Sequence, residues 1–222
     1  MKRFILPMVC VALLFACGAA LASGPTDPVD QFLLGQKHEK GDGVAKDMKK
    51  AFYWYEKSAK QGFAPAQFET ATYYDFGEAG VKKDYVTAAY WYGEAARQGE
   101  VNSRYNLGGL LWEGGYGLER NREKAMDWWF LASLQGHAGA QHNLGYAYAQ
   151  RGKQDPEQFK KAYYWYRRAA DQGSAKDQWH VGVFLENGLG VEKNMDSAVC
   201  WYRKAAAQGH ADAKKRLQKL GY

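Results

Sequence analysis

Five histidines are the residues of this sequence best suited to bind a metal ion or to transfer protons: His38, His137, His142, His180 and His210. His142 and His180 fall in segments that we expect to form neighbouring helices, so their side chains could approach each other. No carboxylate or cysteine stands at a spacing that would complete a zinc site around them. The sequence therefore predicts no metal site and no cofactor, and it indicates that these histidines are polar residues of a surface or groove.

Nucleophilic catalysis is not indicated either, because a serine or cysteine nucleophile needs a base and a group that orients this base. Four serines stand where equivalent segments of the chain carry alanine or another small residue: Ser103, Ser133, Ser174 and Ser197. Cys200 stands where equivalent segments carry tyrosine or aspartate, which predicts a partly accessible thiol in a packing role, with a redox or dimerising role as the alternative. Several turns contain Gly-x-Gly, but the Gly-Lys-Ser/Thr of a phosphate-binding loop does not follow. We therefore expect no catalytic residue and no enzyme activity.

A motif that occurs five times indicates the elements that position these side chains. It reads Ala-x-x-Trp-aromatic-x-x-(Ala/Ser)-(Ala/Ser)-x-Gln-Gly, and it begins at Ala51, Ala88, Ala125, Ala162 and Ala198. Steps of 37, 37, 37 and 36 residues separate its tryptophans, which are Trp54, Trp91, Trp128, Trp165 and Trp201. A constant step of this size is typical of a stacked array of structural repeats.

Each repeat is expected to contain two helices joined by a glycine-containing turn. The second helix carries small and aromatic residues at i, i+3, i+4, i+7 and i+8, which form one stripe on a helix. We expect its tryptophan to fill the space between layers. A capping residue stands four positions before the first alanine in four repeats, at Asp47, Asp84, Asn121 and Asn194. The glycine of each Gln-Gly is expected to end the helix in the left-handed conformation.

The fourth repeat departs from this pattern, since it lacks the glycine turn. Asp155, Pro156 and Gln158 form a capping sequence there. We therefore expect Asp155 to be the N-cap of a helix that starts earlier than in the other repeats. The repeats are expected at residues 30–62, 63–99, 100–136, 137–173 and 174–209, with a capping helix at 210–222.

The first 22 residues have the features of a signal peptide. Lys2 and Arg3 are followed by an apolar run over residues 4–16, and Ala20 and Ala22 give the small-x-small pattern of a cleavage site. The mature chain then begins at Ser23, with a flexible linker over residues 23–29. These features predict a periplasmic or secreted protein.

Two other interpretations of the N-terminus stay open. Residues 14–17 resemble a lipoprotein box, in which Cys17 would be lipidated and would hold the protein at a membrane. The leader could also remain as an uncleaved anchor, although its apolar run is short for a membrane span.

The charge of the chain is only mildly positive. The net charge is +6, and it falls to +4 when Lys2 and Arg3 are removed with the leader. Nucleic-acid binding normally needs a concentrated basic face, and the charges here are interspersed, so no nucleic-acid partner is expected. Cys200 is the only cysteine beyond the leader. Stability is therefore expected to come from packing between repeats rather than from disulfides.

The two halves of the repeat together resemble the Sel1-like repeat. The first half reads Ala-Gln-x-Asn-Leu-Gly-x-x-Tyr, as at residues 140–148, and the second half is the motif described above. The resemblance covers residues 30–220. It implies an all-α fold, a right-handed α-solenoid of about five helix-turn-helix repeats similar to tetratricopeptide arrays, with the first helices lining a concave face. It also implies a non-enzymatic scaffold or adaptor of the bacterial cell envelope, which binds a protein or an extended peptide and takes no small-molecule substrate.

One branch of this family is rich in cysteine and has been linked to penicillin binding and β-lactamase activity. Among the repeats only the fifth contains a cysteine, Cys200, so the resemblance does not extend to that branch. A cell-wall or β-lactam ligand binder or hydrolase remains the alternative function, and a lipoprotein tether is another.

The candidate binding residues lie on the expected first helices. By analogy with tetratricopeptide packing, the residue two positions before each Leu-Gly pair faces the groove, which gives Phe32, Phe68, Tyr105, His142 and Trp179. An aromatic row beside acids and an arginine suits an extended peptide or a partner helix. Aromatic residues at this position can equally be packing residues, and both interpretations stay open. Binding is favoured for Trp112, because tryptophan is unusual at its position. The predicted partner-binding residues are Phe68, Asp75, Arg104, Tyr105, Trp112, His142, Tyr146, Trp179 and Glu186.

Overall fold

The structure is a computed structural model that describes residues 24–222, and the elements within this range are all α-helices. The expected signal peptide at 1–22, its cleavage after Ala22 and the alternative lipidation of Cys17 lie outside the described residues. Within residues 24–222, no helix combines the length and the apolar character that crossing a membrane requires.

The chain divides into two compact units, with the boundary between Gln98 and Gly99. The first unit contains the helices α2 (Pro28–Lys40), α3 (Met48–Lys60), α4 (Ala64–Phe76) and α5 (Tyr85–Arg97). The second contains α6 (Val101–Glu113), α7 (Arg122–Leu134), α8 (Ala138–Gly152), α9 (Gln158–Asp171), α10 (Ala175–Asn187), α11 (Met195–Ala207) and α12 (Ala211–Lys219).

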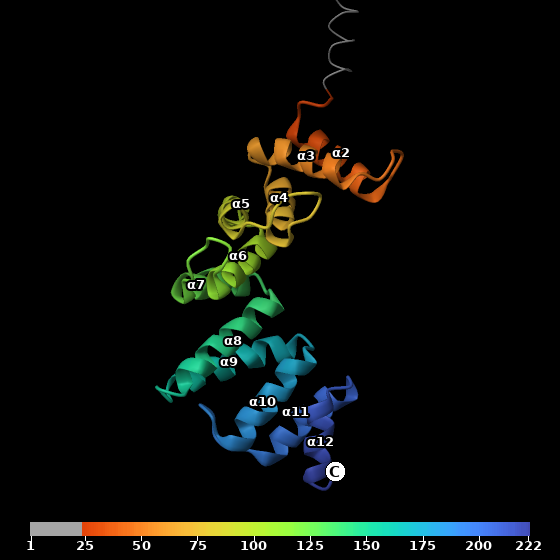
Figure 1. The fold of residues 1–222 in the computed structure, drawn as a ribbon. Coiled ribbons are helices and arrows are strands. Elements are labelled where there is room, and N and C mark those ends of the chain that lie inside the picture. The colour runs from red at the N-terminus through yellow and green to blue at the C-terminus, as the bar shows by residue number, and fades with distance from the viewer. Residues whose placement is uncertain (1–23) are drawn as a thin grey trace, which may run out of the picture. The chain divides into compact units, whose positions relative to one another are not determined.

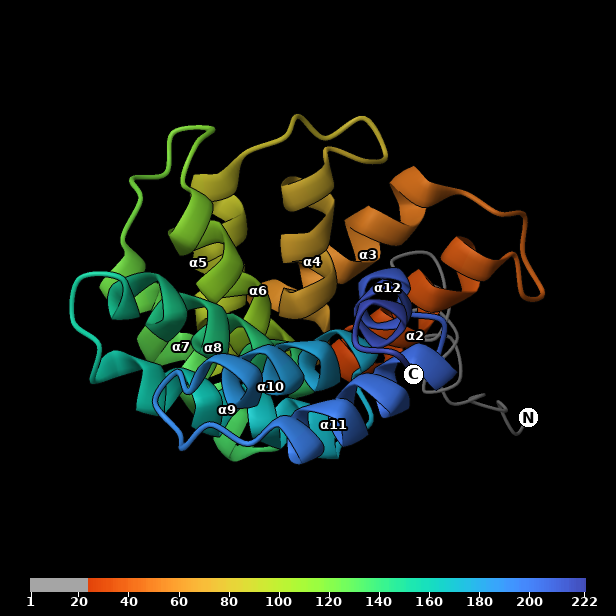
Figure 2. The ribbon, with the colours of Figure 1, turned by 90° about the horizontal axis from the view of Figure 1, so that it is seen from below.

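Within each unit, every helix packs on the helix that follows it. Two successive helices form one repeat, and Figure 1 shows these pairs in chain order, while Figure 2 shows the loops that join the helices of a pair. The expected all-α solenoid of helix-turn-helix repeats is therefore confirmed, and α12 is the additional helix at its C-terminal end.

The local signals that the sequence carries act as expected at most helix ends. The side chain of Asp47 accepts hydrogen bonds from the backbone N–H groups of Lys49 and Lys50, and Asp84, Asn121 and Asn194 cap their helices in the same way. Each glycine of the Gln-Gly pairs has a positive φ, such as +90° at Gly62, so it adopts the left-handed conformation that ends the helix.

The start of α9 differs from the expectation. The helix begins at Gln158, one residue earlier relative to its repeat than in the others, but its N-cap is Glu157 and not Asp155. Asp155 instead accepts hydrogen bonds from the Glu157 N–H at 3.2 Å and from the Gln158 side chain at 2.7 Å. Its carboxylate therefore fixes the turn that precedes the helix, because the backbone at 155–158 is a tight turn of its own.

The centre of each repeat is the aromatic residue that follows the repeated tryptophan. These residues are almost completely buried, and they are Tyr55, Tyr92, Trp129, Tyr166 and Tyr202. The glycine on the first helix lies directly against this ring, since a Cβ on Gly145 would lie 2.6 Å from Cδ1 of Tyr166. The tryptophan expected to fill the space between layers is thus the more peripheral of the two aromatic residues, and Trp54 and Trp128 are only half-buried.

Glutamine pairs connect the two helices of a repeat at their other end. The side-chain amide of the Gln in Gln-Gly donates to the side-chain oxygen of a glutamine on the first helix, at distances of 2.7–2.9 Å, in the pairs Gln61–Gln31, Gln98–Gln67, Gln172–Gln141 and Gln208–Gln178. Each first-helix glutamine is buried. In the third repeat its position is occupied by Arg104, one of the predicted binding residues, whose side chain is half-buried.

Candidate functional site

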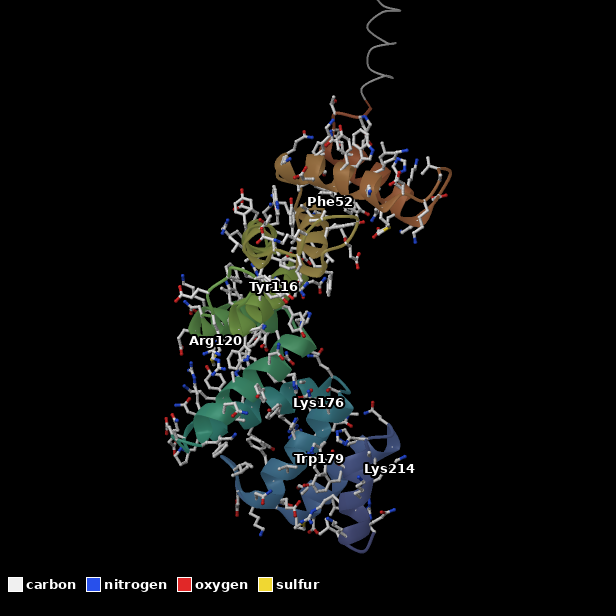
Figure 3. All side chains as sticks on the ribbon, in the orientation of Figure 1. Phe52, Tyr116, Arg120, Lys176, Trp179 and Lys214 are labelled. Carbon is white, nitrogen blue, oxygen red and sulfur yellow. The ribbon has the colours of Figure 1, made fainter. Side chains whose placement is uncertain are left out.

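The aromatic row that the sequence predicts on the first helices makes packing contacts within the repeats. Tyr105 on α6 stacks on His137, with ring centroids 4.4 Å apart. Trp179 on α10, labelled in Figure 3, stacks on His210 at 5.6 Å and also contacts Tyr202. His137 is the N-cap of α8, the first helix of the following repeat, and His210 is the N-cap of the terminal helix α12. Tyr105 and Trp179 therefore each pack against the helix that begins the next part of the array.

Phe68 in the first unit packs within its own repeat, because its ring lies 5.8 Å from that of Tyr92. All residues of the row are half-buried rather than exposed. Only part of each ring is therefore accessible to a ligand, and the observed ring contacts are with other residues of the repeats.

Two predicted acidic residues accept hydrogen bonds from the central tyrosines. The Tyr202 hydroxyl donates to Oε2 of Glu186 at 2.6 Å, and the Tyr92 hydroxyl donates to Oδ2 of Asp75 at 3.3 Å. Burial raises the pKa of Asp75, and the hydrogen bond from Tyr92 opposes this effect. These carboxylates are internal partners of buried hydroxyl groups.

Glu186 has a second internal partner. Both Nε and Nη2 of Arg216 on α12 donate to its carboxylate, the first at 3.0 Å, and the Glu186 residue is only 9% exposed. The structure places Glu186 in the interior, where it holds α12 on the last repeat, and not on an open groove. The sequence showed the acid but not its partner, which stands 30 residues further along the chain.

The third repeat replaces this acid–tyrosine pair with two tryptophans. Trp112 stands at the position of Asp75 and Glu186, and its ring lies 5.2 Å from that of Trp129, which stands at the position of the central tyrosine. The indole N–H of Trp129 donates to the backbone oxygen of Tyr105 at 3.1 Å. Because this repeat has no phenol hydroxyl to satisfy, it needs no acid, and the position is free to carry a large aromatic ring.

Trp112 also contacts two side chains outside its own pair with Trp129. The Arg122 guanidinium lies 4.9 Å from the centre of its ring, and the ring of Tyr146 on α8 lies 6.3 Å away, edge to face. Tyr146 is 45% exposed. Trp112 and Tyr146 are thus two predicted binding residues that the fold brings together, from neighbouring repeats.

A hollow of about 390 Å³ adjoins Trp112. It is lined by Trp112, Arg122, Glu123, Ala147, Gln150, Arg151, Lys153 and Gln154. Arg151 forms an ion pair with Glu123, and the Lys153 ammonium donates to Gln150 at 2.8 Å. Three cationic side chains and one carboxylate therefore surround an aromatic wall, an arrangement suited to an acidic group. Only Trp112 and the helix that carries Tyr146 were indicated by the sequence, because the cations come from the ends of α7 and α8 and from the loop after α8.

The two histidines expected to approach each other do so. The rings of His142 on α8 and His180 on α10 lie 5.9 Å apart, and His180 stacks on Tyr166 at 4.5 Å. His142 Nδ1 lies 2.6 Å from Oδ1 of the buried Asp177, a carboxylate that the sequence analysis did not connect to it. Burial lowers the pKa of His180 to about 4.

This cluster is not arranged for nucleophilic catalysis. The Ser174 hydroxyl donates to Asp177 and not to an imidazole, and its oxygen caps α10 by accepting from the Asp177 N–H at 3.3 Å. An activated serine would instead donate to a histidine base. Across residues 24–222, no three histidine, cysteine, aspartate or glutamate side chains are grouped to hold a metal ion. The arrangement is that of a polar contact between two repeats.

Comparison with known proteins places the repeats in a broader setting. The family model described as Sel1 repeat matches residues 28–63, 64–100, 101–137, 138–174 and 175–210. A solved structure of a protective antigen present in uropathogenic Escherichia coli strains, displaying an SLR fold, is 34% identical with a TM-score of 0.76, over 88% of this chain and 41% of that one. The chain thus spans about two fifths of that protein. A Sel1 repeat protein from Oxalobacter formigenes is 32% identical with a TM-score of 0.73, over 86% of this chain and 75% of that one. No match was found among curated proteins.

Proposed function

Because the chain belongs to the Sel1 repeat family, whose members typically serve as scaffolds for protein–protein interactions, we propose that it is a scaffold that binds an extended, acidic segment of a partner protein. The proposed contact surface is formed by Trp112 and Tyr146 and by the cationic hollow beside them. The observation that carries the proposal is this hollow, where an indole and three cationic side chains meet a single carboxylate.

The charge around the hollow indicates the chemistry of the segment. Arg151 is neutralised in part by Glu123, whereas Arg122 is held against the Trp112 ring and also lines the hollow. An arginine placed in this way can bind a carboxylate through two parallel hydrogen bonds. Trp112 and the exposed Tyr146 ring supply apolar surface for the side chains beside that carboxylate.

Synthetic peptides test this proposal. One labelled peptide carries glutamate and aspartate in an extended, proline-containing sequence, and its twin carries glutamine and asparagine at the same positions. Fluorescence anisotropy with the full mature chain is expected to show that the acidic peptide binds at least about tenfold more tightly. Its affinity should fall with rising salt concentration, because the contact is electrostatic.

Two variants locate the contact. Trp112→Ala and Arg122→Gln are each expected to weaken binding of the acidic peptide, and Arg122→Gln keeps the indole pair of the repeat intact. Lys124→Gln is the matched control, since Lys124 is an exposed cation on the same helix that does not line the hollow. If Arg122→Gln and Trp112→Ala bind the acidic peptide as the wild type does, the hollow is not the contact surface.

The cellular setting is part of the same proposal. The signal-peptide pattern of residues 1–22 supports a role in the bacterial cell envelope, either as a released periplasmic or secreted protein or as a lipoprotein tether. The mass of the mature protein, isolated from the native host, distinguishes these forms. An N-terminus at Ser23 supports release, whereas a lipid-modified Cys17 supports the tether.

A further inference from the structure

The outer face of α7 carries three exposed apolar side chains near its C-terminal end. Phe130, Leu131 and Leu134 are 45%, 38% and 63% exposed. Leu134 stands at i+4 from Phe130 and at i+3 from Leu131, so its side chain neighbours both of the others. In water, apolar surface of this kind is unfavourable, and contiguous apolar patches of proteins often mark contact sites.

The repeats themselves provide the comparison that makes this face unusual. The same three positions in the other repeats carry mostly charged residues, namely Glu56, Lys57 and Lys60 in the first, Gly93, Glu94 and Arg97 in the second, Arg167, Arg168 and Asp171 in the fourth, and Arg203, Lys204 and Ala207 in the fifth. The helix pairs of those repeats form without large apolar residues at these positions. The scaffold therefore does not require Phe130, Leu131 and Leu134.

The apolar face continues onto α9, the second helix of the following repeat. The Phe130 ring lies 6.0 Å, edge to face, from that of Trp165, which is buried beneath the surface, and the neighbouring Tyr164 ring is 50% exposed. The Arg168 guanidinium lies 5.7 Å from the centre of the Tyr164 ring and 6.0 Å from that of Trp165. α7 and α9 are both labelled in Figure 1.

Arg168 places a positive charge at the edge of this face. It donates a hydrogen bond to the Tyr164 hydroxyl at 2.9 Å, and within residues 24–222 it has no ion pair with a carboxylate. In the same helix Arg167 is paired with Asp171. Arg168 can therefore still receive an acidic group from another molecule.

We propose that this surface, formed by Phe130, Leu131, Leu134, Tyr164 and Arg168, binds an amphipathic helix of a partner protein that carries a carboxylate beside its apolar stripe. A helix presents an apolar stripe of matching width at i, i+3, i+4 and i+7. The three exposed α7 side chains present on the order of 300 Å², whereas a stable dimer buries roughly 800 Å² on each partner. The size favours a single helix over a second copy of this chain, and the charge of Arg168 favours an acidic one.

This surface is formed by second helices, and it shares no residue with the hollow beside Trp112. The two proposals can therefore fail separately. The substitutions used below leave Trp112, Arg122 and Tyr146 unchanged, and binding of the acidic extended peptide should be unaffected by them.

The probes for the test are three labelled synthetic helices of about 18 residues. The first carries leucine at i, i+3, i+4 and i+7 with glutamate beside the stripe, the second has lysine in place of that glutamate, and the third has the composition of the first in an order that gives no stripe. We expect the full mature chain to bind the first most tightly and the third not measurably.

The chain supplies its own matched substitutions. The triple variant Phe130→Glu, Leu131→Lys, Leu134→Lys gives α7 the outer residues of α3, which the same scaffold already accepts, and it should weaken binding of the first helix by about tenfold or more. The reverse graft on α3, Glu56→Phe, Lys57→Leu, Lys60→Leu, is the control for non-specific binding and should not restore affinity for the glutamate helix, since α5 carries Glu94 at the position of Arg168. Arg168→Glu should reverse the preference between the glutamate and lysine helices. Circular dichroism and thermal melting establish that each variant is folded.

Three results would overturn the proposal. The first is equal binding of the striped and stripeless helices, and the second is an unchanged affinity in the α7 triple variant. The third is a concentration-dependent dimer in sedimentation velocity that the triple variant abolishes, since it would assign the surface to a second copy of the chain. Retention of the glutamate preference in Arg168→Glu would remove Arg168 from the binding surface.

Discussion

Arg216 of α12 binds Glu186 of α10 through two guanidinium nitrogens, across 30 residues of sequence, while the same carboxylate accepts the hydroxyl hydrogen of Tyr202. Asp75, at the equivalent position of the second repeat, accepts a hydrogen bond from the tyrosine of its own repeat. Glu186 in addition attaches the last helix, α12, through Arg216. The terminal helix of a repeat array must cover the apolar face of the last repeat. Here a charged residue supports that cover together with the buried Ala213 and Leu217.

Removal of Arg216 is therefore expected to destabilise the C-terminal end. Arg216→Met leaves the nearly buried Glu186 with only the Tyr202 hydroxyl, and the free energy of unfolding should fall by about 2 kcal/mol. Urea denaturation monitored by circular dichroism measures this change. Lys215→Met, which removes an exposed neighbouring charge, should change stability little, and an equal loss in both variants would contradict the structural role of Arg216.

Two adjacent glycines of α6 are expected to respond oppositely to alanine. A Cβ on Gly108 would lie 2.5 Å from Cδ1 of Trp129, whereas a Cβ on Gly109 meets no atom within 4 Å. Gly109→Ala should stabilise the chain by about 0.5–1 kcal/mol, because glycine is the poorer helix former. Gly108→Ala should destabilise it by about 1–3 kcal/mol through displacement of the buried ring. Thermal melting of the two variants side by side tests the pair, and similar shifts would refute the close contact at Gly108.

Stability of the second unit is expected to fall in mild acid because of His180. Its pKa is lowered to about 4 by burial against Tyr166, while an unfolded histidine has a pKa of about 6.5. The unfolded chain therefore binds this proton first, and stability present above about pH 6.5 is lost as the pH falls toward 4, by up to about 3 kcal/mol. The nearby Asp177 carboxylate opposes the shift, while His142, Lys176 and His210 add to it.

The contribution of His180 can be separated from that of other titrating groups. His180→Asn introduces the residue found at the equivalent position in the third and fourth repeats, Asn106 and Asn143. The free energy of unfolding of both proteins is measured by urea denaturation between pH 7 and pH 4. As the pH falls, the wild type should lose more stability than the variant, and this difference is the contribution of His180. Parallel curves would show that His180 does not titrate with a lowered pKa.

The glutamine pairs should contribute to stability as connected units. Gln141 is buried, its amide donates to the Ser133 backbone oxygen at 3.4 Å, and its oxygen accepts from Gln172 at 2.7 Å. Gln141→Ala should cost about 1–3 kcal/mol, because buried polar groups lose their partners. In a double-mutant cycle with Gln172→Ala, we expect the second substitution to cost less once the first is present. Strict additivity of the two changes would mean that the side chains do not act together.

The sequence was sufficient for the architecture because a repeat encodes its fold several times. The step from Trp54 to Trp201 predicted the helix pairs, and Asp47, Asp84, Asn121 and Asn194 were correctly predicted as N-caps, since capping depends on atoms within a few residues. The prediction that Asp155 is an N-cap was wrong for an equally local reason. The residues that favour a helix cap also favour a tight turn, and the backbone at 155–158 forms a turn.

The surroundings of the candidate binding residues were predicted less well for a physical reason. Trp112 and Tyr146 lie together, but Glu186 and Trp179 have internal partners, Arg216 and His210, that lie about 30 residues away in sequence. A residue's position in the repeat indicates which face of its helix it occupies. It does not indicate whether a side chain from the next repeat covers that face.

The sequence by itself thus determined the helices, most of their ends and their order, because these depend on local hydrogen bonds and on a pattern repeated along the chain. Only the tertiary structure decided which of the two neighbouring aromatic residues lies in the core, which carboxylates are neutralised internally, and that Phe130, Leu131 and Leu134 face solvent. These properties depend on side chains brought together from different repeats. Burial and pairing are consequences of packing, and packing is set by residues that the sequence places far apart.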